Sequence, residues 1–313
     1  MSDRSGFVRY VRRLLVGILT MTGLLLPAAG AAAVSDGSGA DRGDTAPRIF
    51  QGSGFDTCQA PDLATMRAWR ASSAYGAVGI YFGGRARACK SQLHLTTDWV
   101  QQTTADGWGL LPIYVGSQSP CVTGSNKNPY RIDPLRASAQ GGDEGEDAVA
   151  AAQALGLDKG SPLYLDMEAY DTRDADCDAA TLTFVRAWDR AVRAAGYLTG
   201  FYSSADSGIR HMETARRAGV GDLPDVVWYA RWGVDATLTD EPVLAAGAWP
   251  SHARIHQYTG SVTETHGGST LTIDRDLIDA PVAIVAPAGS RLGRLPAGQP
   301  RVHPRPGPAR HHW

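Results

Sequence analysis

The sequence PLYLDME at residues 162–168 is an apolar run that ends in two acidic residues. A second pattern follows at residues 179–195, where the apolar side chains at helical spacing are Leu182, Val185, Trp188 and Val192. The short apolar run predicts a buried strand, and the spaced pattern after it predicts a helix. This strand–helix unit is the building block of an α/β protein.

The same unit recurs along the chain from residue 48. The runs that predict strands are residues 48–56, 77–82, 109–115, 162–168, 198–203, 225–230, 253–258 and 271–274. Because helical patterns separate most of these runs, we expect parallel strands in a closed (β/α)8 barrel of the TIM type. The helical patterns are weak after the sixth strand, so that side of the barrel is expected to be irregular. An open doubly wound sheet is the alternative, but no glycine-rich phosphate loop opens a helix here.

Composition divides the chain into four segments. We expect a signal peptide at residues 1–33, a linker at 34–47, the barrel at 48–283 and a disordered tail at 284–313, which is rich in Pro, Arg and His.

The signal peptide is predicted from a basic start, an apolar run and a stretch of small residues. The apolar run at residues 14–26 has 13 residues, whereas a membrane span needs about 20, which disfavours an uncleaved anchor. The pair Arg12 and Arg13 also permits a twin-arginine signal. We therefore expect a secreted or wall-associated protein that meets the membrane only through its transient signal.

The segment between the two ends of the chain is strongly acidic. The chain has a net charge of −2, and residues 1–33 and 287–313 contribute +3 and +5, which leaves −10 between them. An acidic body argues against nucleic acid as a partner. We expect a monomer without a cofactor or a bound metal.

The four cysteines predict two disulfides, because their number is even and the chain is predicted to be exported. Cys58 and Cys89 follow the first two strands, and Cys121 and Cys177 follow the next two. Neighbouring strands lie about 4.8 Å apart, and a disulfide needs Cα atoms about 4.4–6.8 Å apart. We therefore predict a 58–89 and a 121–177 bond. Four free thiols are the alternative; no pair has the close spacing of a zinc site.

Polar residues gather at the strand ends, where a barrel of this type builds its active site. The candidates are Asp56, Tyr81, Tyr114, Asp166, Glu168, Tyr202, Trp228, Gln257, Asp274 and Asp276. We expect Asp56, Asp166, Glu168 and Asp274 to be catalytic and the remaining six to bind substrate.

The pair Asp166 and Glu168 is the strongest candidate. Residues two apart on a strand share a face, with Cα atoms about 6.6 Å apart. Two carboxylates this close raise each other's proton affinity, so one can act as a general acid while the other stays charged. Glycosidic cleavage uses such a pair. A solvated strand end is the simpler alternative, and a site for a hard cation, which would also use Asp274 and Asp276, is another.

Five motifs resemble those of family 25 glycoside hydrolases, which are lysozymes that cleave peptidoglycan on a modified barrel. The motifs are GFDT at 54–57, YLDME at 164–168, GFYS at 200–203, WYARW at 228–232, and IHQY at 255–258 followed by Ile273-Asp274. An even closer likeness is to the glycoside-hydrolase-like domain of unknown function in exported actinobacterial proteins, some of which carry twin-arginine signals. The likeness covers residues 48–283.

The resemblance implies roles for four carboxylates. Glu168 would be the general acid, Asp166 would stabilise the charged sugar centre or orient an acetamido group, and Asp56 and Asp274 would line the site. The sequence departs from the lysozymes in its cysteines, in its long loop at residues 116–142 and in the DRD motif at 274–276. We expect the protein to hydrolyse or bind a cell-wall polysaccharide; a catalytically inactive glycan-binding or wall-associated protein is the alternative.

Overall fold

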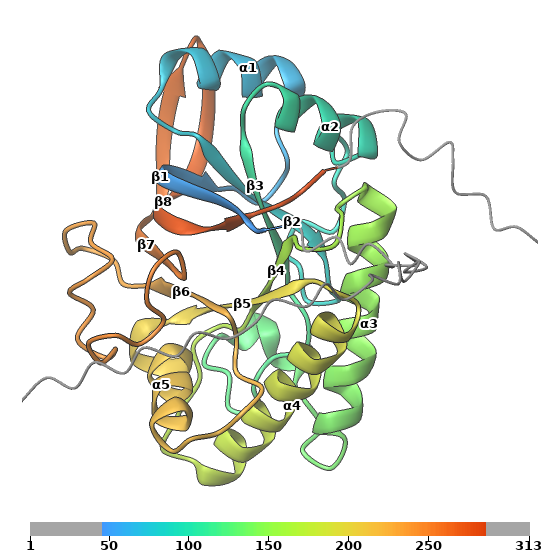
Figure 1. Cartoon of the computed structure of the whole chain (residues 1–313), viewed down its shortest axis with the longest axis vertical. Helices are drawn as coiled ribbons and strands as arrows, with labels where there is room; N and C mark the ends of the chain where they lie inside the picture. The colour runs from blue at the N-terminus through green and yellow to red at the C-terminus, as the bar shows by residue number, and fades with distance from the viewer. Residues whose placement is uncertain (1–45, 286–313) are drawn as a thin grey trace, which may run out of the picture. The chain divides into compact units, whose positions relative to one another are not determined.

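The computed structural model describes residues 46–285, all of which belong to one compact unit (Figure 1). The predicted signal peptide, most of the predicted linker and nearly all of the predicted tail lie outside the described residues. The strands are β1 (Arg48–Asp56), β2 (Ala77–Gly83), β3 (Gly109–Tyr114), β4 (Pro162–Asp166), β5 (Leu198–Ser204), β6 (Val226–Ala230), β7 (Arg254–His266) and β8 (Ser269–Val282). The helices are α1 (Leu63–Ser72), α2 (Thr97–Ala105), α3 (Ala137–Leu155), α4 (Ala175–Ala194) and α5 (Arg210–Arg217).

The eight strands close into a barrel in sequence order, which confirms the predicted fold class. Strands β1 to β7 are parallel, but β8 is antiparallel to both β7 and β1. The expectation that all strands are parallel is therefore wrong for β8. Only Gly267 and Gly268 separate β7 from β8, and a parallel connection would need a dozen or more residues. Both glycines have positive φ, as a two-residue hairpin turn requires.

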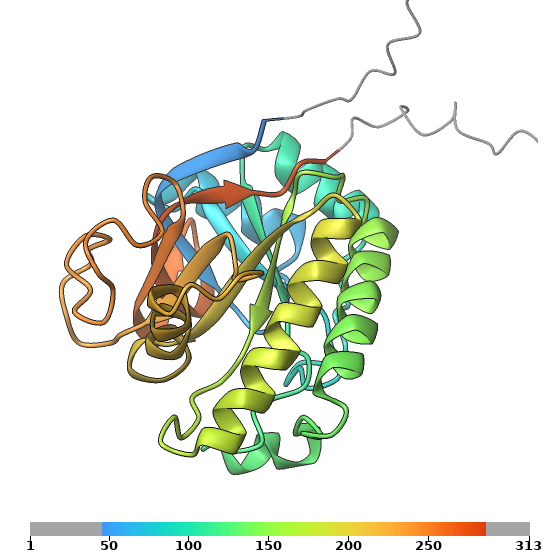
Figure 2. The same ribbon diagram turned by 60° about the horizontal axis from the view of Figure 1, so that its bottom comes forward.

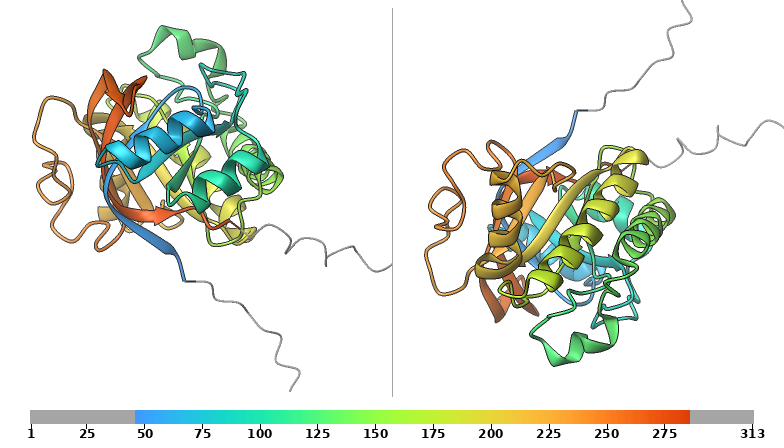
Figure 3. Two further views of the ribbon diagram at one scale, coloured as in Figure 1. Left: turned by 90° about the horizontal axis from the view of Figure 1, so that it is seen from above. Right: turned by 90° about the horizontal axis from the view of Figure 1, so that it is seen from below.

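The barrel is irregular after β6, as the sequence predicts. The structure has no helix between Ala230 and Arg254, and this segment forms the loops in orange on the left of both views in Figure 3. Among the described residues, no helix is both long enough and apolar enough to cross a membrane.

Helices α3 and α4 pack closely side by side against the barrel (Figure 2). Gly141 and Gly145 of α3 permit this approach, because a Cβ at Gly141 would lie 2.3 Å from the carbonyl oxygen of Phe184 in α4. Helix α4 begins at Asp174, whose carboxylate accepts hydrogen bonds from the backbone N–H groups of Asp176 and Cys177. Helix α3 begins inside the loop that the sequence predicts at 116–142, so this loop is shorter than expected.

Two apolar cores flank the strands, because strand side chains alternate between the barrel interior and the helices. In β4, Tyr164 points inward and belongs to the interior core, whereas Leu163 and Leu165 pack against the helices. The same alternation points Asp166 into the barrel, at the carboxyl end of the strand.

The structure confirms both predicted disulfides. Cys58 is bonded to Cys89 with Cα atoms 5.7 Å apart, and Cys121 to Cys177 with Cα atoms 5.9 Å apart. The second bond joins the loop after β3 to the start of α4, so it holds one wall of the barrel mouth.

Candidate active site

The antiparallel course of β8 sets two acids beside the end of β1. Asp56 is the last residue of β1 and pairs with Asp274 of β8, while Gly54 pairs with Asp276. Asp274 and Asp276 therefore lie level with the carboxyl ends of the parallel strands. Asp166 ends β4, and Glu168 follows it two residues later.

Gln257 of β7 is the centre of a hydrogen-bond network at this end of the barrel. Its amide nitrogen donates to Asp56 Oδ2 at 2.8 Å and to Asp274 Oδ2 at 3.4 Å. Its Oε1 accepts from the hydroxyl of Tyr202 at 2.9 Å and from the indole N–H of Trp232 at 3.1 Å. The network links β1, β5, β7 and β8 and fixes the orientation of the Gln257 amide.

The acids of the candidate site act on one another electrostatically. Burial, together with the charges of Asp274 and Glu168, raises the pKa of Asp56 to about 7, against hydrogen bonds from Tyr81 and Gln257 that lower it. Burial and then the charge of Glu168 raise the pKa of Asp166, although Lys127 opposes this.

The two acids of β8 belong to the same group. Burial raises the pKa of Asp274, and the charge of Glu168 adds to the effect. Burial raises the pKa of Asp276, and the charges of Asp56 and Asp274 add to it, against a hydrogen bond from Trp228. Five carboxyl groups from three strands and the chain after β4 therefore share one site.

The acids form two levels. Asp56, Asp166 and Asp276 are buried, whereas Glu168 and Asp274 are partly exposed at the mouth. Asp166 Oδ1 and Asp276 Oδ2 are buried atoms without a hydrogen-bond partner among the described residues. Since buried polar atoms are normally paired, these two oxygens suit a bound donor.

Gln118 positions the end of β4, and the sequence analysis did not identify it. Its amide nitrogen donates to the carbonyl oxygen of Asp166 at 2.9 Å, and its Oε1 accepts from the backbone N–H of Glu168 at 2.8 Å. The side chain is fully buried. Its position in a long polar loop of the sequence gave no signal of this role.

Lys127 is the second site residue that the sequence analysis missed. It lies in a short 3-10 helix, Ser125–Tyr130, within the loop after β3, and only 7% of the residue is exposed. Its Nζ lies 3.2 Å from Glu168 Oε1 and donates to the carbonyl oxygen of Ala86 at 3.3 Å. A cation therefore contacts the predicted general acid.

The aromatic candidates lie at different depths. Tyr81 donates to Asp56 Oδ1 at 2.7 Å, and Trp228, which is fully buried, donates to Asp276 Oδ1 at 2.9 Å. Trp232 follows β6 and is 54% exposed, with its ring so close to Gly260 that a Cβ there would clash. Trp232 thus presents an exposed aromatic ring whose indole is bonded into the network around Gln257.

The predicted role of Tyr114 in substrate binding is wrong, because its side chain points away from the barrel interior. Its hydroxyl donates to Asp147 of α3 at 2.7 Å, and its ring packs near Trp188 of α4. Its neighbours Ile113 and Val115 belong to the interior core instead. Tyr114 therefore joins β3 to the helices.

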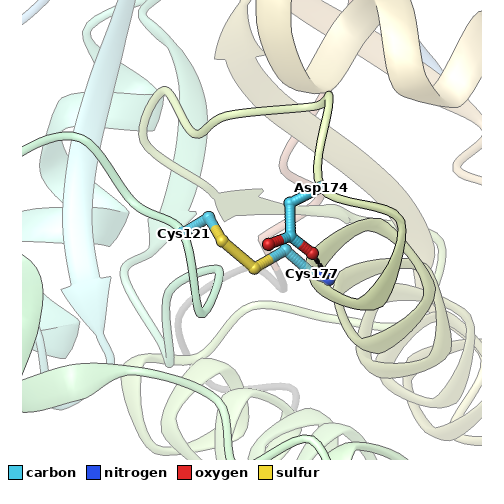
Figure 4. A group of neighbouring side chains, drawn as sticks. All are labelled: Cys121, Asp174 and Cys177. Atoms are coloured by element: carbon cyan, nitrogen blue, oxygen red, sulfur yellow. Dashed lines mark hydrogen bonds between the residues drawn. A yellow bond between two sulfur atoms is a disulfide. The ribbon is translucent and has the colours of Figure 1, made fainter.

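No compact cluster of metal ligands occurs among the site's acids. Within residues 46–285, the one group of three such ligand atoms is Cys121, Asp174 and Cys177 (Figure 4). The two sulfurs form a disulfide and Asp174 caps α4, so these residues do not offer thiolates to a metal.

A largely apolar cavity of about 720 Å³ lies at the opposite end of the barrel. Its walls include Trp249 and the first residues of β5 and β6, Leu198 and Val226. None of the five acids of the candidate site lines it. Because TIM-type barrels build their active sites at the carboxyl ends of the strands, the chemistry is expected at the acidic end.

The chain has a family match and several structural relatives. The model of the Rv2525c-like, glycoside hydrolase-like domain matches residues 67–278. No curated protein matches the chain.

Among solved structures, the Mycobacterium tuberculosis Tat-secreted protein Rv2525c in complex with L-tartrate has 17% identity and a TM-score of 0.50, and the match covers 74% of this chain and 97% of that one. An uncharacterized protein from B. stearothermophilus has 20% identity, coverage of 72% and 95%, and a TM-score of 0.46. The modular autolysin LytC from Streptococcus pneumoniae has 13% identity, coverage of 72% and 46%, and a TM-score of 0.45. At these identities the likeness concerns the fold alone.

Proposed function

Because the chain belongs to the Rv2525c-like, glycoside hydrolase-like domain family, we propose that it is an exported protein that hydrolyses a cell-wall polysaccharide of the peptidoglycan type. One observation supports the proposal: at the carboxyl end of the barrel, Gln257 donates hydrogen bonds to both Asp56 and Asp274, and Asp166 and Glu168 act electrostatically on this pair. TIM-type barrels host many functions, so it is the residues of the site that support this one.

The proposed reaction assigns different tasks to the two levels of acids. Glu168, whose side chain is 40% exposed, can reach a glycosidic oxygen and would protonate it as the general acid. Asp166 lies buried beneath it and would stabilise the charged sugar centre. Asp56 and Gln257 would hold the sugar through the hydrogen-bond network, and Trp232 would stack on its ring.

Export is part of the same proposal. Two disulfides are typical of proteins from oxidising compartments, and the relative Rv2525c is described as Tat-secreted. We propose that residues 1–33 are the signal and that 48–283 form the barrel. The mature protein would act as a monomer on wall glycans.

The test is the release of reducing ends from purified peptidoglycan and other wall glycans. We expect turnover by the wild type and a loss of about 100-fold or more in Glu168→Gln, because a general acid contributes about that much. Glu146→Gln is the matched control, since Glu146 lies exposed on α3 and away from the site. Equal activity in wild type and Glu168→Gln, or no turnover by either, would count against hydrolysis.

A glycan-binding protein without catalysis is the second candidate, and the ion pair between Lys127 and Glu168 favours it. Lys127 Nζ lies 3.2 Å from Glu168 Oε1, so the residue proposed as the general acid is already held in an ion pair within the site. In this case wall glycans would bind to wild type and to Glu168→Gln alike, without turnover. Trp232→Ala would weaken binding because it removes the exposed ring.

A further inference from the structure

We infer that the site selects a sugar with a free ammonium group, such as a de-N-acetylated hexosamine, over the corresponding N-acetylated sugar. The inference rests on the proposed glycan site and specifies its substrate class. It follows from the charge of the site, from its unpaired oxygens and from its aromatic walls.

The site holds more acidic than basic groups. Five carboxyl groups meet there, and within residues 46–285 their one ion pair is that between Lys127 and Glu168. The charged neighbours that act on Asp56, Asp274 and Asp276 are other acids of the same group. Since like charges in a buried site repel, a cationic ligand would relieve this repulsion and a neutral one would not.

The buried oxygens give a second, independent reason. Asp166 is 4% exposed, and its side chain has no hydrogen-bond partner among the described residues. An ammonium group offers three N–H donors, which match several carboxylate acceptors. An acetamido group offers a single N–H donor where the ammonium group offers three.

The walls of the site favour an organic cation over a metal ion. Tyr81, Tyr202 and Trp232 present aromatic groups beside the acids, and an ammonium group is attracted to aromatic faces. Their rings also suit the apolar face of a sugar. Within residues 46–285, no three ligand atoms of the five acids lie within 4.8 Å of one another, so the arrangement does not form a compact metal cage.

Substitution of Lys127 should change the binding of the two kinds of sugar differently. Its ammonium group occupies the place beside Glu168 and Asp166 that a cationic sugar would approach. Lys127→Met removes this internal cation and leaves a side chain of similar length. We therefore expect Lys127→Met to bind the ammonium-bearing sugar more tightly, and the N-acetylated sugar without such a gain.

The experiment is calorimetric titration of the purified full chain with two oligosaccharides of equal length, β-1,4-linked glucosamine and β-1,4-linked N-acetylglucosamine. We expect wild type to bind glucosamine oligomers about tenfold or more tightly than N-acetylglucosamine oligomers. This difference corresponds to one charge-assisted contact. Asp166→Asn should reduce this preference, Lys127→Met should increase it, and Glu146→Gln should leave it unchanged.

Three results would overturn the inference. The first is equal or tighter binding of the N-acetylated oligomer, which leaves the proposed glycan site intact. The second is the absence of binding by both oligomers; turnover of wall glycans in the assay above would then preserve the proposed function. The third is tight binding of Mg²⁺ or Ca²⁺ alone that blocks both sugars, which would identify a metal site.

Discussion

At the residue scale, the candidate site depends on the alternation of side chains along the barrel strands. Asp56, Asp166, Gln257 and Asp276 each lie at a strand position whose side chain enters the barrel, as the period of two requires. Tyr114 lies near a strand end, but the residues on either side of it point into the barrel, so its own side chain points outward. A position near a strand end therefore predicts a site residue only when the alternation of side chains also places it inward.

Lys127 and Gln118 could not be predicted from such rules. Both lie in the irregular segment after β3, where no period relates sequence position to direction. Only the folded path of that segment, joined to α4 by the Cys121–Cys177 bond, brings them to Asp166 and Glu168.

At the residue scale, Asp166→Asn should stabilise the protein in a pH-dependent way. Burial and the charges of Glu168 and Asp56 raise the pKa of Asp166 well above its ordinary value of 3.8, with Lys127 opposing them. A raised pKa in the folded state contributes stability below the ordinary pKa, and this contribution is lost as the pH rises through the folded value. The free energy of unfolding of wild type therefore falls as the pH rises from 5 to 8. Asp166→Asn lacks this contribution to the fall, because an amide does not ionise.

Thermal unfolding at both pH values measures this effect. We expect the melting temperature of Asp166→Asn to exceed that of wild type at pH 8 by about 2–4 °C for each kcal/mol gained, with a smaller difference at pH 5. A melting temperature below that of wild type by the same amount at both pH values would show that Asp166 is held by structural contacts instead.

At the scale of elements, the sequence predicted the strands better than their directions. The runs at 253–258 and 271–274 mark only parts of β7 and β8. Strand β7 continues past the first run to the turn, and β8 continues past the second run to Val282. The pair Gly267-Gly268 between two extended runs is a hairpin signal, and it would have predicted the antiparallel direction of β8. The apolar pattern did not predict the full length of the hairpin, because the far part of β7 is an exposed ribbon in which exposed and partly buried residues alternate.

Two adjacent glycines of α3 test the packing of α3 against α4. Gly141→Ala should destabilise the fold by about 1–3 kcal/mol, because the added methyl group meets the backbone of Phe184. Gly142→Ala is the matched control: a Cβ there meets nothing within 4 Å, so alanine should stabilise the helix by up to about 1 kcal/mol. Chemical denaturation measures both, and equal effects of the same sign would contradict the close approach of the two helices.

At the scale of the whole molecule, closure of the barrel by β8 brings the acids together. Asp274 and Asp276 are 218 and 220 positions away from Asp56 in the chain, yet they lie on the strand that pairs with β1. The sequence predicted a closed barrel and so predicted that its two ends meet. It could not predict the mutual repulsion of the acids or the ion pair to Lys127, because both depend on distances within the assembled mouth.

The most direct test of the central claim is to observe the indole N–H signals of the isotopically labelled protein during titration with soluble wall-glycan fragments. The indole of Trp232 is bonded to Gln257 in the site, whereas those of Trp69 and Trp108 are bonded to backbone carbonyl groups elsewhere. We predict that the Trp232 signal, assigned with Trp232→Phe, shifts in proportion to occupancy while the signals of Trp69 and Trp108 stay in place. A Trp232 signal that does not move while fragments bind would place the glycan elsewhere and contradict the proposed site.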